Sequence, residues 1–172
     1  QPPPPMLVSP TFEERFPAET AAAKAVARQV VLGARANEEA RRRFAGRYLL
    51  NTIANFPAIG REGDVAALDG LFGDVPAIVV GAGPSLDQNL ADLKRLAGRA
   101  LVIACDTAVR PLLAAGIRPH LAVSVDPSQT NACHLAELPD ARGIFFAAEG
   151  SIEPGLFRQF EGRTFLFKVS NH

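Results

Sequence analysis

The sequence predicts an α/β protein with a Rossmann-like, mostly parallel sheet and flanking helices, preceded by a helical N-terminal appendage. Five short apolar runs alternate with helical patterns from residue 77 onward, as in a series of β–α–β units. The first run, 77–80, is rich in β-branched residues without a polar interruption, which is typical of a strand buried on both faces. It leads directly into the glycine turn Gly81-Ala82-Gly83.

Two parts of the chain are expected. Residues 1–74 form the helical N-terminal segment, and residues 75–172 form a Rossmann-like nucleotide-binding domain. The N-terminal segment should hold one helix from about Glu19 to Ala34. A second helix should run from an N-cap at Asn37 to Phe56, because Pro57 disfavours helix at the residue before it.

The elements after the second helix follow in chain order. A loop at 60–64 precedes a short helix at 65–72. The expected strands are then 77–80, 100–105, 121–125, 143–148 and 164–169, and the expected helices between them are 86–97, 107–115, 128–138 and 154–160. Strands that alternate with helices predict parallel pairing through right-handed crossovers.

Composition excludes several classes of partner. Eighteen basic residues balance eighteen acidic ones, so charge gives no case for nucleic-acid binding. No apolar run reaches the length of a membrane span, and no charged leader precedes the first helix. Cys105 and Cys133 form neither a C-x-x-C motif nor a disulfide framework, so a reducing, cytoplasmic location is expected.

The glycine turn is the first candidate ligand site. Gly81 and Gly83 permit backbone angles and a close ligand approach that a Cβ would forbid. Ser85 is expected to be the N-cap of the next helix, with Gln88 completing a capping box. A helix N-terminus offers free N–H groups and a positive dipole end to a phosphate. The turn lacks both the third glycine of the dinucleotide fingerprint and the lysine of a P-loop, so a purely structural turn is the alternative.

Polar residues end the next three strands, at Asp106-Thr107, Asp126-Pro127 and Glu149-Gly150. In open parallel sheets, ligands bind outside the carboxyl ends of the strands, at a switch point in strand order. Asp106 follows Gly83 by 23 residues, close to the usual spacing of an acid that accepts a ribose hydroxyl. A helix N-cap is its alternative role. Asp126 precedes a proline, where a cap is less natural, which favours contact with a ligand or a metal.

Three ordered blocks of sequence resemble the MptE-like family. They read P-A-I-V-V-G-A-G-P-S-L-D from Pro76, V-I-A-C-D-T-A from Val102, and G-I-R-P-H-L-A-V-S-V-D-P from Gly116. The family includes the bacterial motility accessory factors, or Maf proteins, and the archaeal 6-hydroxymethylpterin pyrophosphokinases. The Maf proteins resemble glycosyltransferases that attach nonulosonic sugars to flagellin from CMP-activated donors.

A wider similarity to bacterial sialyltransferases implies which residues bind the nucleotide. Their first block reads G-N-G-P-S-L, and its loop holds the nucleotide; Ala82 here replaces the asparagine and loses its side-chain contact. By resemblance, the nucleotide-binding residues are Gly81, Gly83, Pro84, Ser85, Asp106, Thr107, Asp126 and Pro127. The family's pattern continues past residue 172, so the catalytic residues are expected beyond this chain.

The resemblance implies a transferase in the full-length protein. The first hypothesis is a Maf-like glycosyltransferase, or its N-terminal part, that binds a CMP-activated nonulosonic acid for transfer to a protein such as flagellin. The alternative is a 6-hydroxymethylpterin pyrophosphokinase that uses ATP and magnesium, with Asp126 and Asp106 as metal ligands. A third hypothesis is a non-catalytic nucleotide-binding domain. No cofactor is certain from the sequence, and magnesium belongs to the second hypothesis.

Overall fold

The computed structural model describes residues 6–96 and 98–169. Residues 1–5, the last residue of the helix expected at 86–97, and residues 170–172 lie outside the described residues. The chain divides into two compact units, residues 1–45 and 46–172. The domain boundary predicted between residues 74 and 75 stays a prediction. The boundary between the compact units lies earlier, so residues 46–74 belong to the same unit as the sheet.

The first unit is helical. Helix α1 (Pro10–Arg15) precedes α2 (Pro17–Ile59), which contributes its first part to this unit. The Phe12 and Phe16 rings lie 5.2 Å apart, and the Lys24 ammonium contacts the Glu13 carboxylate at 2.5 Å. No helix among the described residues has the length and apolar character needed to cross a membrane.

The predicted break between two N-terminal helices is wrong, because α2 is continuous. Asn37 lies within it, between alanines and long charged residues that favour helix, and asparagine in a helix costs only a fraction of 1 kcal/mol, roughly 0.7 or less. The predicted end before Pro57 is also wrong, since this proline lies inside the final turn of α2. The missing N–H of Pro57 removes one hydrogen bond, and the helix ends two residues later.

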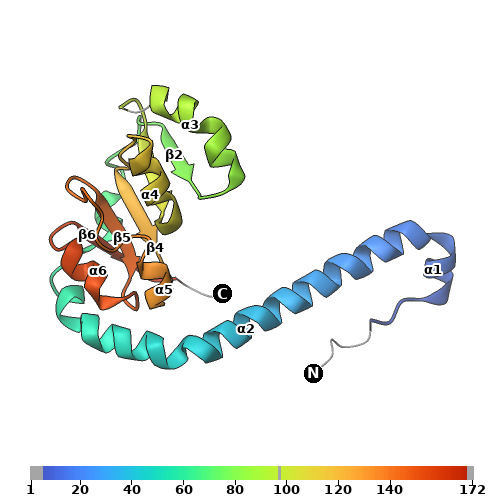
Figure 1. Ribbon diagram of the computed structural model, residues 1–172. Helices are drawn as coiled ribbons and strands as arrows, with labels where there is room; N and C mark the ends of the chain where they lie inside the picture. The colour runs from blue at the N-terminus through green and yellow to red at the C-terminus, as the bar shows by residue number, and fades with distance from the viewer. Residues whose placement is uncertain (1–5, 97, 170–172) are drawn as a thin grey trace. The chain divides into compact units, whose positions relative to one another are not determined.

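The second unit is built on a six-stranded parallel sheet in the order β1-β6-β5-β4-β3-β2 (Figure 1). The strands are β1 (Gly63–Asp64), β2 (Ala77–Val80), β3 (Leu101–Cys105), β4 (Leu121–Ser124), β5 (Phe145–Glu149) and β6 (Thr164–Phe167). The helices after α2 are η1 (Val65–Leu68, a 3-10 helix), α3 (Pro84–Leu96), α4 (Asp106–Ala114), α5 (Gln129–Ala132) and α6 (Pro154–Gln159). Strands β2 to β6 lie side by side in chain order, so the expected switch point does not occur among them.

Three expected elements differ from the structure. Strand β1 lies where a loop was expected, because only its pairing with β6 defines so short a strand. The helix expected at 65–72 is the single 3-10 turn η1. The helix expected at 128–138 is reduced to α5, with the Ser128 hydroxyl as its N-cap, and the chain continues in turns.

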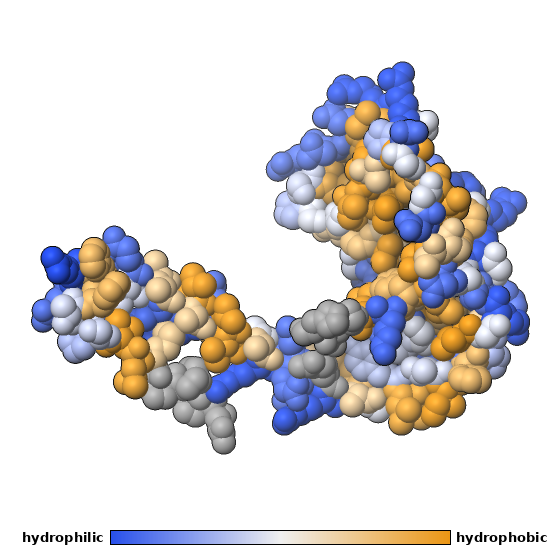
Figure 2. Space-filling model, turned by 180° about the vertical axis from the view of Figure 1, so that it is seen from behind, coloured by the Kyte–Doolittle hydropathy of each residue, from blue (hydrophilic) through white to orange (hydrophobic). Residues whose placement is uncertain are grey.

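One face of the sheet carries the core. Val102, Ala104, Ala122 and Phe146 are buried there with apolar residues of the helices that connect the strands. The register places Val79, Ile103, Leu121 and Phe145 in one row on the opposite face. In that row Val79 is 79% exposed, so the expected burial of β2 on both faces is wrong. Hydrophobic residues are visible at the surface of this unit from behind (Figure 2).

Candidate functional site

The glycine turn leaves open space at the carboxyl end of β2. A Cβ at Gly81 would meet no atom within 4 Å, and one at Gly83 would meet only the Ser85 hydroxyl, at 3.8 Å. Neither glycine has a positive φ, so the expected need for unusual backbone angles is wrong. What the absence of side chains provides here is room, which a ligand can use to approach the main chain.

Helix α3 begins two residues earlier than expected, which changes the role of Ser85. Pro84 is the first residue of α3, a position that proline favours because its fixed φ suits the helix and no N–H is lost. Ser85 is therefore inside the helix, and the predicted N-cap and capping box with Gln88 are wrong. The Leu86 amide donates to the Gly83 carbonyl oxygen at 2.9 Å. The amides of Gly83 and Ser85 have no acceptor among the described residues.

Asp106 is held by three donors from neighbouring elements. Its Oδ1 accepts from the Thr107 amide at 2.7 Å, and its Oδ2 accepts from the Ser124 hydroxyl at 2.8 Å and the Asn131 side-chain amide at 2.6 Å. Cys105 is the N-cap residue of α4, so the alternative that Asp106 is itself the cap is wrong. The three bonds join the ends of β3 and β4 to α5. Asp106 therefore positions the edge of the sheet on which a ligand would lie.

The Asp126 carboxylate accepts fewer hydrogen bonds from the protein than that of Asp106. Among the described residues, only the Ser128 amide donates to its carboxylate, at 2.7 Å to Oδ1. This bond forms a turn around the buried Pro127 and leads into α5. The half-buried carboxylate retains acceptor capacity at the carboxyl end of β4. It is the predicted site residue best able to contact a ligand through its side chain.

Two asparagines of α2 hold the strand-end loops in place by hydrogen bonds, a role that the sequence did not predict. Asn51 and Asn55 are one helical turn apart, and each side-chain amide donates to two backbone carbonyl oxygens. The acceptors are Pro127 (3.0 Å) and Ser151 (2.9 Å) for Asn51, and Gly150 (2.9 Å) and Ile152 (2.8 Å) for Asn55. Polar residues at this spacing within a helix also occur on solvated faces, so the sequence carried no distinguishing signal for them.

Two further polar side chains, those of Glu149 and Tyr48, lie near Asp126. The Ser151 hydroxyl donates to Glu149 Oε2 at 2.8 Å. Burial raises the pKa of Tyr48, and the charges of Glu149 and Asp126 raise it further, so the phenol stays protonated and able to donate a hydrogen bond. A hollow of about 490 Å³ lies beside Glu149, between α2 and the ends of β1 and β6.

The described residues offer limited support for a metal ion. No three histidine, cysteine, aspartate or glutamate side chains among them converge as a set of ligands. Magnesium is commonly held by one or two carboxylates together with substrate phosphates. Asp126 fits such a partial set, because most of its acceptor capacity is open. Asp106 fits poorly, since protein donors already occupy both of its oxygens.

Comparisons with known proteins bear on the family. No curated protein matches the sequence significantly. A solved structure, the Maf glycosyltransferase from Magnetospirillum magneticum AMB-1, matches with 24% sequence identity and a TM-score of 0.48. The match covers 58% of this chain but only 17% of that one. The sequence model of the family described as 6-hydroxymethylpterin diphosphokinase MptE-like matches residues 50–172, which include the whole sheet. The chain therefore belongs to the MptE-like family.

Proposed function

We propose that the carboxyl edge of the sheet binds a nucleotide-activated donor, and that the full-length protein is a Maf-like glycosyltransferase. The donor would be a CMP-activated nonulosonic acid, and the acceptor a protein such as flagellin. The phosphate would lie on the Gly83 and Ser85 amides, in the room left by Gly81. Asp126 would accept a hydrogen bond from the ribose or base, with Thr107 and Pro127 beside it. Asp106 would hold this edge in place.

The choice of donor rests on one observation: no cationic side chain lines the described part of the hollow beside the glycine turn. A hollow of about 300 Å³ adjoins the turn; the described residues that line it include no lysine or arginine, and its charged residue is Asp92. The Lys94 side chain belongs to the last turn of α3, far along the helix from Ser85. A CMP-activated sugar carries a single phosphate diester, for which backbone amides and a helix N-terminus suffice. The triphosphate of ATP needs cationic groups or metal ions to neutralise its charge.

A 6-hydroxymethylpterin diphosphokinase is the second candidate, favoured by the description of the family. It would require ATP and magnesium, with Asp126 as the protein's carboxylate ligand. A bound magnesium ion would neutralise phosphate charge during diphosphate transfer. The third candidate is a domain that binds nucleotide without catalysis. A cytoplasmic location, and the absence of nucleic-acid or membrane partners, remain predictions from composition.

Calorimetric titration of the chain with CMP, CDP and ATP, each with and without Mg²⁺, separates these candidates. We expect CMP to bind without metal, and Gly81→Val, which fills the open space, to weaken CMP binding by about tenfold or more. We expect valine to be tolerated at this position, because a Cβ there would meet no atom within 4 Å. Binding of ATP only with Mg²⁺ would favour the diphosphokinase. Equal CMP affinity in the Gly81→Val variant would overturn the proposed phosphate position.

Ser85→Ala separates a ligand contact from a structural role. Because Ser85 is exposed and is not the N-cap of α3, we expect the free energy of unfolding to change by less than about 0.5 kcal/mol. CMP affinity should fall severalfold if the hydroxyl contacts the phosphate. Urea unfolding and calorimetry of the same preparation measure both quantities. A large loss of stability would return the serine to the capping role that the structure does not give it.

A further inference from the structure

A second hollow, of about 500 Å³, lies at the opposite edge of the sheet, where α4 ends and the chain enters β4. Its lining combines two arginines with apolar side chains, and includes Arg110, Leu113, Ile117, Arg118, Pro139 and Asp140. We propose that this hollow binds a small organic anion, in which a phosphate or carboxylate group is attached to an apolar body. This site is separate from the carboxyl edge and goes beyond the proposed function.

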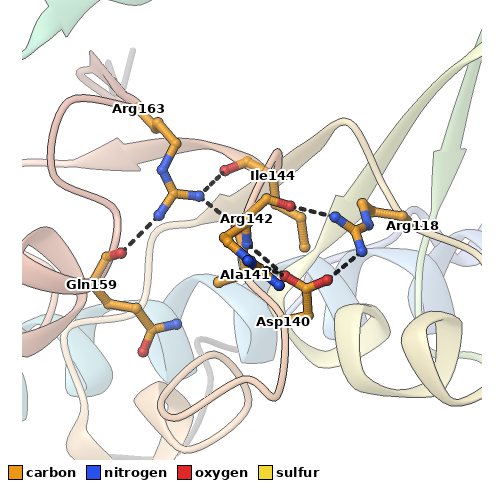
Figure 3. A network of polar contacts seen from close by, with 7 residues as sticks. All are labelled: Arg118, Asp140, Ala141, Arg142, Ile144, Gln159 and Arg163. Carbon is orange, nitrogen blue, oxygen red and sulfur yellow. Dashed lines mark hydrogen bonds and ion pairs between the residues drawn. The ribbon is translucent and has the colours of Figure 1, made fainter.

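Both guanidinium groups are fixed in place by the protein. Arg110 donates from Nε to the Cys133 carbonyl oxygen at 3.1 Å, and from Nη2 to the Ala136 carbonyl oxygen. Arg118 donates to the Arg142 carbonyl oxygen at 2.6 Å and to Asp140 (Figure 3). A guanidinium has five N–H donors, so each arginine keeps donors for a ligand. Because the side chains are already ordered, binding an anion requires little further loss of rotamer entropy.

The charge around the hollow is predominantly positive. Asp140 is the one acidic residue of its lining, and both Arg118 and Arg142 pair with it, at 2.5 and 3.2 Å. Hydrogen bonds from Arg142 and Arg118 lower the pKa of Asp140, so the carboxylate is ionised at neutral pH. The Lys94 ammonium lies 3.9 Å from where a Cβ on Gly116 would be. Cations therefore outnumber the acid here, which attracts an anion.

Three carbonyl groups near the C-terminus of α4 are hydrogen-bonded within the protein, so they do not face a ligand as free acceptors. The Gly116 amide donates to the Leu113 carbonyl oxygen and the Ile117 amide to that of Leu112, both at 2.9 Å. Gly116 has a φ of 75°, as this closing motif requires. The carbonyl oxygens of Pro111, Leu112 and Leu113 are thus occupied. Leu113, Ile117 and Pro139 supply an apolar surface for the body of the ligand.

The test uses phenyl phosphate as the probe, with phenol and inorganic phosphate as its uncharged and ring-free counterparts. Binding to the whole chain is followed by calorimetry and by amide shifts in NMR spectra. We expect phenyl phosphate to bind more tightly than either counterpart, with shifts at residues 113–118. Arg118→Gln and Arg110→Gln should each weaken binding by about tenfold. Arg99→Gln, an exposed arginine before β3 and outside the hollow, is the matched control and should have no effect.

Asp140→Asn is expected to increase the affinity for phenyl phosphate, a change that loss of structure would not produce. It removes the acid whose charge opposes the ligand, at the loss of exposed ion pairs that contribute little stability. Phenyl phosphate should then bind about threefold or more tightly. Absence of binding at millimolar probe, unchanged affinity in both arginine variants, weaker binding in Asp140→Asn, or shifts confined to residues 81–85 would each overturn the proposal. Loss of CMP binding at the glycine turn would leave it intact.

Discussion

Replacing Asn55 with alanine is expected to lower the free energy of unfolding by roughly 3 kcal/mol. The Asn55 side chain is 2% exposed, and its amide donates to the carbonyl oxygens of Gly150 and Ile152 at 2.9 and 2.8 Å. Alanine would leave both oxygens without this donor and open a cavity between α2 and the loop after β5. Urea unfolding followed by circular dichroism measures the loss.

Two further variants isolate the hydrogen bonds of Asn55. Asn55→Asp keeps the shape of the side chain but replaces the donor with an acceptor, so its effect should equal or exceed that of alanine. Asn89 is the matched control, since its amide also donates to a backbone oxygen, that of Ser85 at 2.7 Å, but on the exposed side of α3. Asn89→Ala should change stability by less than about 0.5 kcal/mol. Equal losses at residues 55 and 89 would contradict the role assigned to Asn55.

Asp106→Ala is expected to destabilise the protein by a similar amount, roughly 3 kcal/mol. The substitution removes the acceptor of three donors at once, from Thr107, Ser124 and Asn131. Ser124 is 2% exposed, so its hydroxyl would lose its partner inside the protein. The loss is measured by urea unfolding. CMP affinity, measured by calorimetry under conditions in which the variant is folded, should change much less than stability.

Asp126→Ala should have the opposite effect, with a small loss of stability and a large loss of CMP affinity. Only the Ser128 amide donates to this carboxylate among the described residues, so the loss of stability should be near 1 kcal/mol. CMP affinity should fall by about tenfold if the carboxylate contacts the ribose or base. If Asp106→Ala instead kept its stability and lost CMP binding, Asp106 would be a direct ligand contact. That result would restore the role in ribose binding that its spacing from Gly83 suggested.

Strands β2 to β6 were predictable because each is a short apolar run between turn residues. The run at 77–80 and the alternation after it were sufficient to predict the parallel α/β class. The sequence also placed Asp106 and Asp126 at strand ends, and both lie there. It could not reveal that Ser124 and Asn131 donate hydrogen bonds to the Asp106 carboxylate, because these bonds depend on the register of β3 with β4 and on where α5 begins.

Other errors have the same cause, which is that long-range contacts decide local structure. Two residues cannot identify β1, and only its partner strand about a hundred positions later does so. Asn51 and Asn55 resemble surface residues until the loops that they hold are known. The error at Ser85 was local: a serine that could cap a helix follows a proline that starts one, and the proline decided the boundary.

The strand order has a consequence for how this unit forms during synthesis. Each of the strands β3 to β6 pairs with the strand made just before it, across separations such as the 24 residues between Ala77 and Leu101. Strand β1 and the end of α2 are made first, yet their partners come last: the Thr164 amide meets Glu62 across 102 residues. Closing that longer loop costs roughly 1 kcal/mol more in chain entropy. Strands β2 to β6 can therefore pair in turn as the ribosome releases them. The hydrogen bonds of Asn51 and Asn55 form only after the loops that contain their acceptors have been made.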